Sequence, residues 1–530
     1  MPETDAGQSN SPGATPLSRR AAGTILAAVG FIYAVLVVSH WNKGYLDFGD
    51  GNYMYISWRL SQGAILYRDV VAPQPPVHLI LGSFIARLGS LFEHPLFAFR
   101  SFSLLLHLAT MVLVYLCTLR VVGGNSTEAR ESQRATGIVA ASIYLLLPIG
   151  FWWTLGYQSQ PIQIFWLLSS FLLLISWQPS RAVGAGALMA LAPLTNMTSA
   201  PYALFSLVYL GVRRPRLLAF YAIPLITIVA GVIGYMEWRT GAYFECVIHN
   251  QAGAFPRQEF LQPGQTPMTY VLGKILREGR NVLDLEGGYV LLALLGLARF
   301  ARRGPEETRE YASFYGFLAM CSIVYVAKGG TVDYIFTIGE PFVAIFGAYL
   351  VTSCWQAHVR GSWREWSWNN FAPAAQLVAL VAIALVVGYN GLIHSYGTLK
   401  QRSYELPEYE TMQLVRDMQK ATAPADLVLS PPMYAFLAQR KIAEDYSELL
   451  LWTLKYANEK ADKKPARGVE VVNQIASLLD AKKIAYIVLE TGQTGRISEI
   501  TDAIARSYDP TRKDPMSTLN TRLMFYKPKP

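Results

Sequence analysis

Apolar runs separated by short polar segments limit this sequence to a membrane fold. In a helix, about 20 apolar residues cross the roughly 30 Å of hydrocarbon in a bilayer, and many of the runs approach that length. Only 16% of the residues are charged, against about 25% in a typical soluble domain. We therefore predict an α-helical polytopic membrane protein with about 11 transmembrane helices, at 22–40, 97–119, 136–156, 160–177, 182–195, 199–212, 217–237, 286–300, 310–327, 334–353 and 372–389.

Arginine clusters set the expected orientation of these spans. They lie at Arg19–Arg20, Arg120–Arg134, Arg181, Arg213–Arg216, Arg299–Arg309 and Arg360–Arg364. All of them fall on one side if the N-terminus is cytoplasmic and the number of spans is odd, as the positive-inside rule requires. Topology thus accounts for the net charge of +9, and we expect no nucleic-acid partner. The prediction is a multi-pass protein of the cytoplasmic (inner) membrane with a disordered cytoplasmic tail at 1–20.

One further apolar run, "VHLILGSFIARLGSLF" (Val77–Phe92), is not counted as a span. Counting it would move the Arg120–Arg134 cluster to the outer side. We interpret it as a helix that lies in the membrane interface or re-enters the membrane. The alternative is that it is a genuine span and that a short run elsewhere is not.

This topology places 41–96, 238–285, 328–333 and everything after about 391 on the outer side. The segment 391–530 has ordinary globular composition. Strand patterns alternate there with helical patterns, which predicts a small soluble α/β domain. The strands are expected at 426–430, 484–490 and 522–527, and the helices at 407–421, 445–459, 468–481 and 496–507. The expected division is therefore a transmembrane domain at 21–390 and an extracytoplasmic α/β domain at 391–530.

The first outer segment, "LDFGDGNYMYISWRLSQGAILYRDVVAPQPP" (Leu46–Pro76), mixes acids with arginines and aromatics. Burial among aromatics at a membrane surface desolvates a carboxylate and raises its pKa, which suits it to take a proton from a hydroxyl or amine. An arginine fork pairs with two oxygens of a lipid-linked phosphate. A polar loop is otherwise simply solvated, and Asp50, as a loop acid near water, is expected to contribute little to stability.

The same stretch resembles the start of the membrane-embedded C-type glycosyltransferases, among them the protein O-mannosyltransferases and the lipid A aminoarabinose transferase. The family has one span, an outer loop with an acidic motif, a Pro-Tyr-Arg-Asp-like segment, a Pro-Pro pair that opens an interfacial helix, and an arginine before the next span. The matching positions are Asp50, Gly63, Tyr67–Asp69, Pro75–Pro76 and Arg100. Further similarity lies in "LMALAPLTN" (188–196) and "VDYIFTIGEPFVAIFGAYL" (332–350).

The resemblance implies a polyprenyl-phosphate sugar as donor, with Asp50 as general base or as a ligand of a divalent metal. The usual acidic pair is Asp50-Gly51 here, so Asp47 is the candidate for the second carboxylate and for a shared metal. The lysine that often precedes Pro-Pro is Gln74, and Arg68, Lys328 or Arg257 are candidates to replace it. We expect Arg68, Arg100 and Lys328 to lie with Asp50 around one cavity. The predicted substrate-binding set is Arg68, Asp69, Arg100, Lys328, Asp333, Tyr334 and His249.

Three function classes are weighed, of which the third, a structural or assembly protein with a folded outer domain, is disfavoured by the mix of acids, aromatics and arginines in the first outer segment. The first is transfer of a sugar from polyprenyl phosphate to a protein, lipid or glycan acceptor at the outer face of the cytoplasmic membrane. The alternative is a multi-span transporter or lipid flippase without glycosyltransfer activity. Transporters bury charge at mid-membrane and show related halves. In this sequence the spans are almost free of acids and bases, and the polar chemistry gathers on one side, which favours the enzyme.

Overall fold

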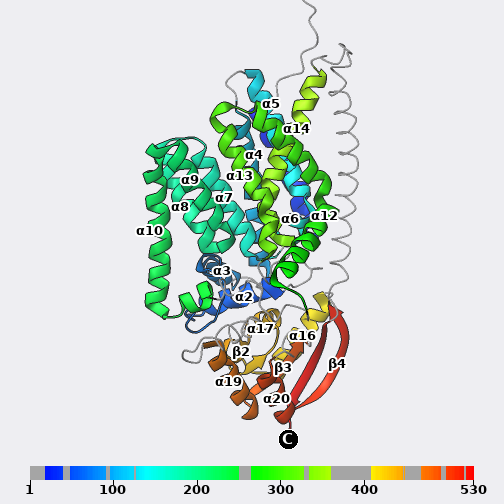
Figure 1. Cartoon of the computed structure of the whole chain (residues 1–530). Coiled ribbons are helices and arrows are strands. Elements are labelled where there is room, and N and C mark those ends of the chain that lie inside the picture. Colours follow the sequence, from blue (N-terminus) through cyan, green and yellow to red (C-terminus); the bar gives the residue numbers. More distant parts are fainter. Residues whose placement is uncertain are drawn as a thin grey trace, which may run out of the picture.

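The computed structural model describes most of the chain. The described residues are 18–39, 48–90, 96–123, 127–154, 156–249, 264–327, 333–359, 408–445, 447, 467–490, 497–518 and 521–530. Figure 1 shows three layers along the long axis of the molecule: a helix bundle, a thin layer that contains α2 and α3, and a β-sheet with its helices at the C-terminal end.

Ten long or medium helices build the described part of the bundle. They are α1 (Arg19–Val38), α4 (Leu96–Val122), α5 (Thr127–Leu146), α7 (Ser159–Leu174), α8 (Pro179–Thr195), α9 (Ala200–Arg213), α10 (Pro215–Thr240), α12 (Pro267–Arg303), α13 (Glu306–Met320) and α14 (Glu340–Val359). Short helical pieces join them: α6 (Pro148–Thr154), η2 (Met197–Ser199), η3 (Phe244–His249), η5 (Cys321–Ala327) and η6 (Asp333–Ile338).

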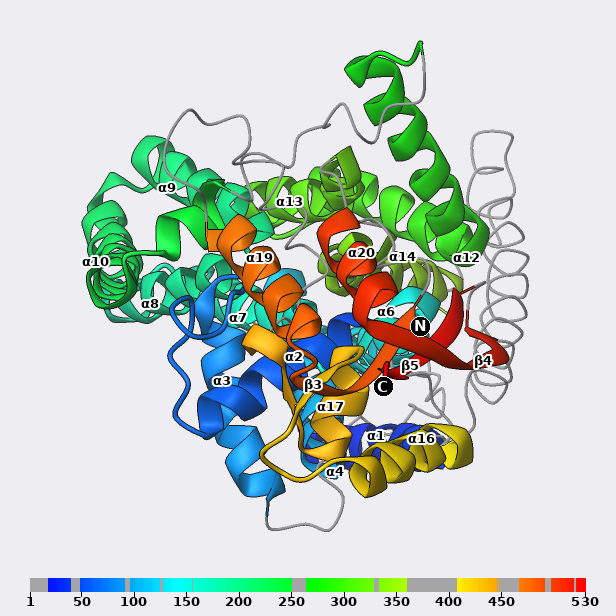
Figure 2. The same cartoon turned by 90° about the horizontal axis from the view of Figure 1, so that it is seen from below.

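Five helical stretches of the described residues are long and apolar enough to cross a membrane: α1, α4, α10, α12 and the continuous stretch Glu306–Ala327. In α10, only 17% of the apolar window is buried inside the protein, so its remaining apolar surface faces outward. Figure 2 shows α10 at one edge of the bundle and α12 at the other. The chain is thus a multi-pass membrane protein. The number of spans stays a prediction, since α7, α8 and α9 are shorter and 372–389 lies outside the described residues.

Helix α12 corrects one expectation. The sequence interpretation placed an outer loop at 238–285 and a span at 286–300, but a single helix of 37 residues begins at Pro267. It starts at a capping box, in which Thr266 and Thr269 satisfy each other's backbone N–H groups. Charged residues such as Arg277 and Arg280 lower the hydropathy of its first half, so a search for apolar runs does not detect this part of the helix. Its length of about 56 Å exceeds the roughly 30 Å of hydrocarbon.

The layer below the bundle is made of α2 (Phe48–Ser61) and α3 (Pro76–Gly89). Helix α3 corresponds to the apolar run that was expected to lie in the interface. Its 14 residues extend about 21 Å, which is too short to cross the hydrocarbon. Helix α2 occupies a stretch that the sequence interpretation treated as a loop.

A five-stranded sheet follows the bundle, with order β2-β1-β3-β5-β4. Strand β1 (Leu427–Leu429) pairs in parallel with β2 (Lys441–Ile442) and β3 (Ile484–Glu490), while β5 (Thr521–Pro528) pairs antiparallel with β3 and β4 (Tyr508–Thr518). The helices here are α16 (Glu408–Ala421), α17 (Pro432–Ala438), η8 (Ala443–Asp445), α19 (Arg467–Asp480) and α20 (Ser498–Ser507). The three predicted strands are present, whereas β2 and β4 were not predicted. Most of the helix expected at 445–459 lies outside the described residues.

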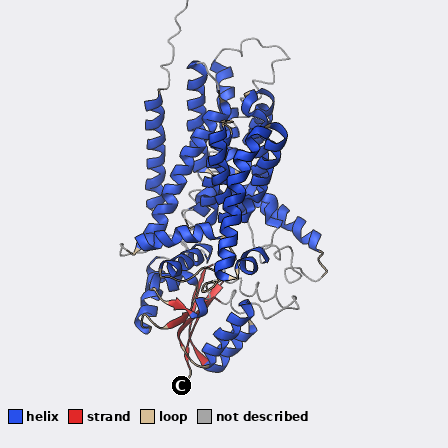
Figure 3. Cartoon of the chain, turned by 90° about the vertical axis from the view of Figure 1, so that its left-hand side faces the viewer, coloured by secondary structure: helices blue, strands red, loops and turns tan. Residues whose placement is uncertain are grey.

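One apolar core joins the sheet to the α2–α3 layer. Tyr53 and Leu79 from that layer belong to the same cluster of buried side chains as Val428 and Ile487 from the sheet. A second core fills the helix bundle. In Figure 3 the strands lie near the C-terminal end of the molecule, below the helix bundle and with other helices beside them. The layer therefore packs against the sheet through the same kind of buried contacts as a domain interior.

The arginine-rich end of the bundle and the sheet lie at opposite ends of the structure (Figure 1), so the topology can be tested with two cysteines. In a background without the four native cysteines, Ser126→Cys should be shielded from a membrane-impermeant maleimide in intact cells. Lys441→Cys should react, because that side chain is 45% exposed on the expected outer side. Labelling of Ser126→Cys together with protection of Lys441→Cys would show that the orientation is the reverse of the expected one.

Candidate active site

Asp50 lies in the first turn of α2 and is buried, with 1% of its surface exposed. The first N–H groups of a helix have no partner within the helix, and a carboxylate near them is favoured by the helix dipole. The burial agrees with the expectation of a carboxylate desolvated among aromatics, whereas the helical position differs from the expectation of a loop acid near water. Asp50 is an interior residue of the layer between bundle and sheet.

Arg100, near the start of α4, is the charged partner of Asp50. Its Nη2 donates to Asp50 Oδ2 at 2.8 Å, and both side chains are almost fully buried. The backbone N–H of Tyr157, between α6 and α7, donates to the other carboxylate oxygen, Oδ1. Three separate segments of chain thus meet at one carboxylate.

The Tyr157 segment is itself held in place. The hydroxyl of Ser103 donates to the carbonyl oxygen of Gly156 at 3.0 Å, and the Tyr157 hydroxyl donates to the carbonyl oxygen of His78 in α3. A Cβ at Gly156 would lie 3.1 Å from the carboxyl carbon of Asp50, so glycine allows the close approach. These contacts fix the N–H of Tyr157 relative to Asp50.

The sheet side closes over the same turn of α2. A Cβ at Gly51 would lie 2.7 Å from the Cβ of Met433 in α17, so a side chain at residue 51 would separate the two helices. The ring of Phe99 lies between the two sides, at 4.8 Å from Tyr157 and 5.8 Å from Phe436, centroid to centroid. Asp50 is therefore at the contact between the bundle, the α2–α3 layer and the sheet region.

A second ion pair fastens α2 to the sheet region. Arg59 donates to both carboxylate oxygens of Asp445, from Nε to Oδ1 at 2.6 Å and from Nη2 to Oδ2 at 3.2 Å. The hydroxyl of Tyr55 donates to Asp445 at 2.7 Å and accepts from the backbone N–H of Ile442 at 2.8 Å. Burial, followed by the negative charge of Asp445, raises the pKa of Tyr55 well above its usual value. The hydroxyl therefore keeps its proton and can hold both contacts.

We expect Asp445→Asn to loosen this attachment. The change leaves the mostly buried guanidinium of Arg59 without its anion, which costs about 1–3 kcal/mol for an unsatisfied buried group. Denaturant titration of the purified protein should show that loss, and hydrogen exchange should increase in α17 and β2. Asp480→Asn is the matched control, because Asp480 pairs with Arg506 on an exposed surface and should leave the free energy of unfolding unchanged. Equal effects of the two changes would contradict the assignment.

The other predicted site residues have different outcomes. Arg68 is 54% exposed and pairs with Asp69 at 2.9 Å, so the structure does not bring it to Asp50. Asp69 also accepts from the backbone N–H of Ile65 and shapes the turn after α2. Tyr334 lies half-buried in η6 against the bundle core. Asp47, Lys328 and Arg257 lie outside the described residues, as do the side chains of Asp333 and His249.

Two buried acids were missed by the sequence interpretation, which described the spans as almost free of acids. Glu286 in α12 and Glu340 in α14 are each 1% exposed. Glu286 accepts from the N–H of Ile149 at 2.8 Å, and Glu340 from the N–H of Gly150 at 2.6 Å. Both carboxyl groups thus hold the N-terminus of α6, the helix that leads to the Tyr157 segment. Glu286 is the first residue of the expected span 286–300 and Glu340 lies within the expected span 334–353, so each acid was visible in the sequence.

The described residues around Asp50 do not fit a divalent cation. Their donors are an arginine and a backbone N–H, whereas such cations take several oxygen ligands. Within the described ranges, no three His, Cys, Asp or Glu side chains gather as a metal site. Asp47, the expected second ligand, is not among those residues. A metal shared by Asp47 and Asp50 stays a prediction, and no chemical step is derived through one.

Comparison with solved structures identifies the fold. ArnT from Cupriavidus metallidurans bound to undecaprenyl phosphate superposes with a TM-score of 0.61 over 96% of this chain and 98% of that chain, at 12% sequence identity. ArnT is a C-type (GT-C) glycosyltransferase. The chain has the GT-C fold. The apo state of the same ArnT gives a TM-score of 0.57 over 95% of this chain and 98% of that chain, again at 12% identity.

The oligosaccharyltransferase of Archaeoglobus fulgidus, in complex with Zn and sulfate, also shares the GT-C fold. Its TM-score is 0.52 at 15% identity, over 95% of this chain and 73% of that chain. No family model and no curated protein matches the chain. The fold thus agrees with the resemblance found in the first outer segment, while the low identities leave the chemistry to be argued from the site itself.

Proposed function

We propose that this protein transfers a sugar from a polyprenyl-phosphate donor to an acceptor at the outer face of the cytoplasmic membrane. The observation that carries the proposal is the buried Asp50–Arg100 pair, located where the apolar GT-C bundle meets the α2–α3 layer and the sheet region. A lipid-linked donor approaches such a place from the bilayer and an acceptor approaches it from water. The undecaprenyl phosphate bound to the similar ArnT supports a lipid of this class as the donor carrier.

Asp50 acts as the general base in this proposal. An acceptor hydroxyl or amine attacks the anomeric carbon of the donor sugar and forms the new glycosidic bond, while the bond from that carbon to the phosphate oxygen breaks. The acceptor proton goes to Asp50, and the bonding electrons leave with the polyprenyl phosphate. A carboxylate offers about four acceptor positions, so the contacts with Arg100 and Tyr157 leave Asp50 able to accept a proton.

Arg100 changes partner as the reaction proceeds. Protonation neutralises Asp50 and weakens its hold on the guanidinium. At the same time the departing phosphodiester becomes a phosphomonoester and gains negative charge. Arg100 then exchanges Asp50 for that phosphate, which it binds with its planar fork. The pair thus couples proton uptake to stabilisation of the leaving group without an unbalanced charge in the buried site.

Several parts of the donor and acceptor sites stay within the proposal. Lys328, Asp333 and His249 belong to segments on the expected outer side, and Tyr334 is the first residue of the span that follows Asp333. All four are proposed to contact the substrates. Asp47 is proposed to assist Asp50, and Arg68 with Asp69 to line the approach from the membrane surface. The N-terminus is cytoplasmic and the sheet region extracytoplasmic in this scheme.

The test uses the full-length protein in nanodiscs with a lipid extract of its own membranes as the donor source. Mass spectrometry should detect free polyprenyl phosphate and a glycosylated product that depend on the protein and are absent with Asp50→Asn. The Asp480→Asn protein is the control and should behave as wild type. Movement of the glycolipid between leaflets without any release of polyprenyl phosphate would refute the proposal and support a flippase.

A further inference from the structure

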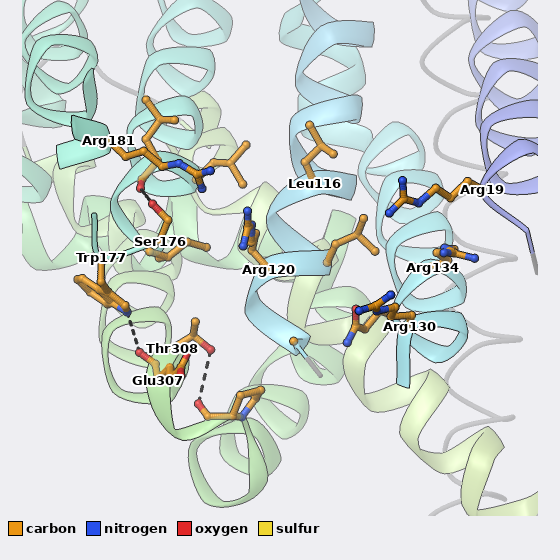
Figure 4. Close-up of a pocket in the computed structure, with 17 residues that line it drawn as sticks. Arg19, Leu116, Arg120, Arg130, Arg134, Ser176, Trp177, Arg181, Glu307 and Thr308 are labelled. Atoms are coloured by element: carbon orange, nitrogen blue, oxygen red, sulfur yellow. Dashed lines mark hydrogen bonds between the residues drawn. The ribbon is translucent and has the colours of Figure 1, made fainter. Parts of the chain in front are cut away.

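A cavity of about 800 Å³ lies at the end of the bundle away from the sheet. It opens among the start of α1, the last turns of α4, the start of α5, the junction between α7 and α8, and the start of α13. Figure 4 shows labelled arginines from several of these elements arranged around it. The five that line it are Arg19, Arg120, Arg130, Arg134 and Arg181.

The charge of this cavity is unbalanced. Its lining contains five arginines and one acid, Glu307. Among the described residues, Arg19, Arg120, Arg130 and Arg181 make no ion pair. At the same end of the bundle, Arg213 does pair with an acid, Glu310, at 2.6 Å. Arg19, Arg120, Arg130 and Arg181 are thus available to bind an anion from outside the described residues.

The positive-inside rule explains why arginines occur at this end, but it does not explain their arrangement. Arginines that serve only topology can spread over every loop, and Arg216 and Arg302 lie exposed outside the cavity. Ligand cavities typically measure about 300–1,000 Å³, and this one falls in that range. Five arginines around one such volume fit a bound anion.

Part of the remaining wall is apolar, beside the polar side chains of Gln133, Ser176 and Thr308. The apolar part consists of Leu116 and Leu119 on α4 and of Leu172, Leu173 and Ile175 around the end of α7. A cationic rim beside an apolar wall at the end of a membrane bundle matches an amphiphile, with its anionic head among the arginines and its chain along the leucines. A free phosphate would use only the rim.

We propose that this cavity binds the phosphate group of an anionic phospholipid from the leaflet at this end of the bundle. Arginine suits the role because its planar fork forms two hydrogen bonds to a phosphate. The site is separate from the Asp50 site, which lies at the opposite end of the helices, and it does not depend on the proposed glycosyltransfer. By the expected topology, the leaflet is the cytoplasmic one.

The test measures lipid retained by the full-length protein. Purified protein is exchanged into detergent with either phosphatidylglycerol or phosphatidylcholine, and native mass spectrometry counts bound lipid. The triple variant Arg120→Gln/Arg130→Gln/Arg181→Gln should lose at least tenfold in affinity for phosphatidylglycerol and nothing for phosphatidylcholine. The control Arg216→Gln/Arg302→Gln/Arg303→Gln removes the same charge from exposed positions outside the cavity and should bind as wild type.

Two further arms keep the result decisive. Glycerol 3-phosphate tests a soluble source: if it occupies the site and the phospholipid does not, the anion site stands and the lipid assignment is wrong. If the glutamine triple does not fold, a triple variant with lysine at the same three positions keeps the charge. It should bind phosphatidylglycerol at least threefold more weakly than the wild type, because the planar forks of arginine are lost. Equal binding by the cavity variants and the control would overturn the proposal.

Discussion

Asp50→Asn is expected to lower the rate of sugar transfer by a factor of about 10²–10⁴, the usual contribution of general base catalysis. The amide oxygen can still accept from the N–H of Tyr157, but an amide takes up no proton from the acceptor. The measurement is the initial rate of polyprenyl phosphate release per folded molecule, with folded protein isolated by size exclusion. Asp480→Asn should retain the wild-type rate.

Folding must be measured beside this rate, since Asp50→Asn also leaves the buried Arg100 without its anion. The expectation from the sequence, that Asp50 contributes little to stability, is wrong because the side chain is interior and paired. A folded Asp50→Asn protein with the wild-type rate would contradict the catalytic role. A low yield of folded protein would not, because the rate is taken per folded molecule.

Arg100→Gln should produce the largest loss of stability in the layer between bundle and sheet. Removing one partner of a buried ion pair leaves an uncompensated charge and costs about 3–5 kcal/mol. Here the stranded group is the carboxylate of Asp50, which only the Tyr157 N–H would still contact among its described partners. Denaturant titration in detergent should give the free energy of unfolding. Arg68→Gln, at an exposed pair, should leave it unchanged.

The double variant Asp50→Asn/Arg100→Gln separates pairing from other effects. With both charges removed, the two amides can hydrogen-bond, so the combined loss should be smaller than the sum of the two single losses. Additive losses would mean that the pair contributes nothing as a pair. In that case Arg100 would serve only to anchor α4 to its neighbours.

The apolar runs and the residues of the first outer segment allowed much of this structure to be predicted. Hydrophobic length predicted the bundle, and the Pro-Pro start with a short apolar run predicted α3. Asp50 and Arg100 were both named from the sequence, but their contact was not derivable from spacing because it joins α2 to α4. The first half of α12 was missed because its charged and polar residues give no hydropathy signal. The capping box at Thr266 and Thr269 marks where the helix begins.

The contacts that the sequence could not provide are mainly those made by backbone groups and by distant chain segments. The N–H of Tyr157 that binds Asp50 has no signature in residue type, and Gly156 permits the approach only in this fold. Nothing in the sequence around Asp445 distinguishes it from other acids of the C-terminal region, yet it forms an ion pair with Arg59 of α2. Glu286 and Glu340 meet at α6 from helices that are far apart in sequence.

The central claim is that the lipid-linked donor binds where Asp50 and Arg100 lie, and a structure with a bound lipid tests it most directly. Cryo-electron microscopy of the full-length protein in nanodiscs with undecaprenyl phosphate should locate the phosphate within hydrogen-bonding distance of Arg100, with its chain running along the bundle. The Arg100→Gln protein, if folded, should lack that density. A phosphate found only among Arg120, Arg130 and Arg181, at the opposite end of the helices, would contradict the claim.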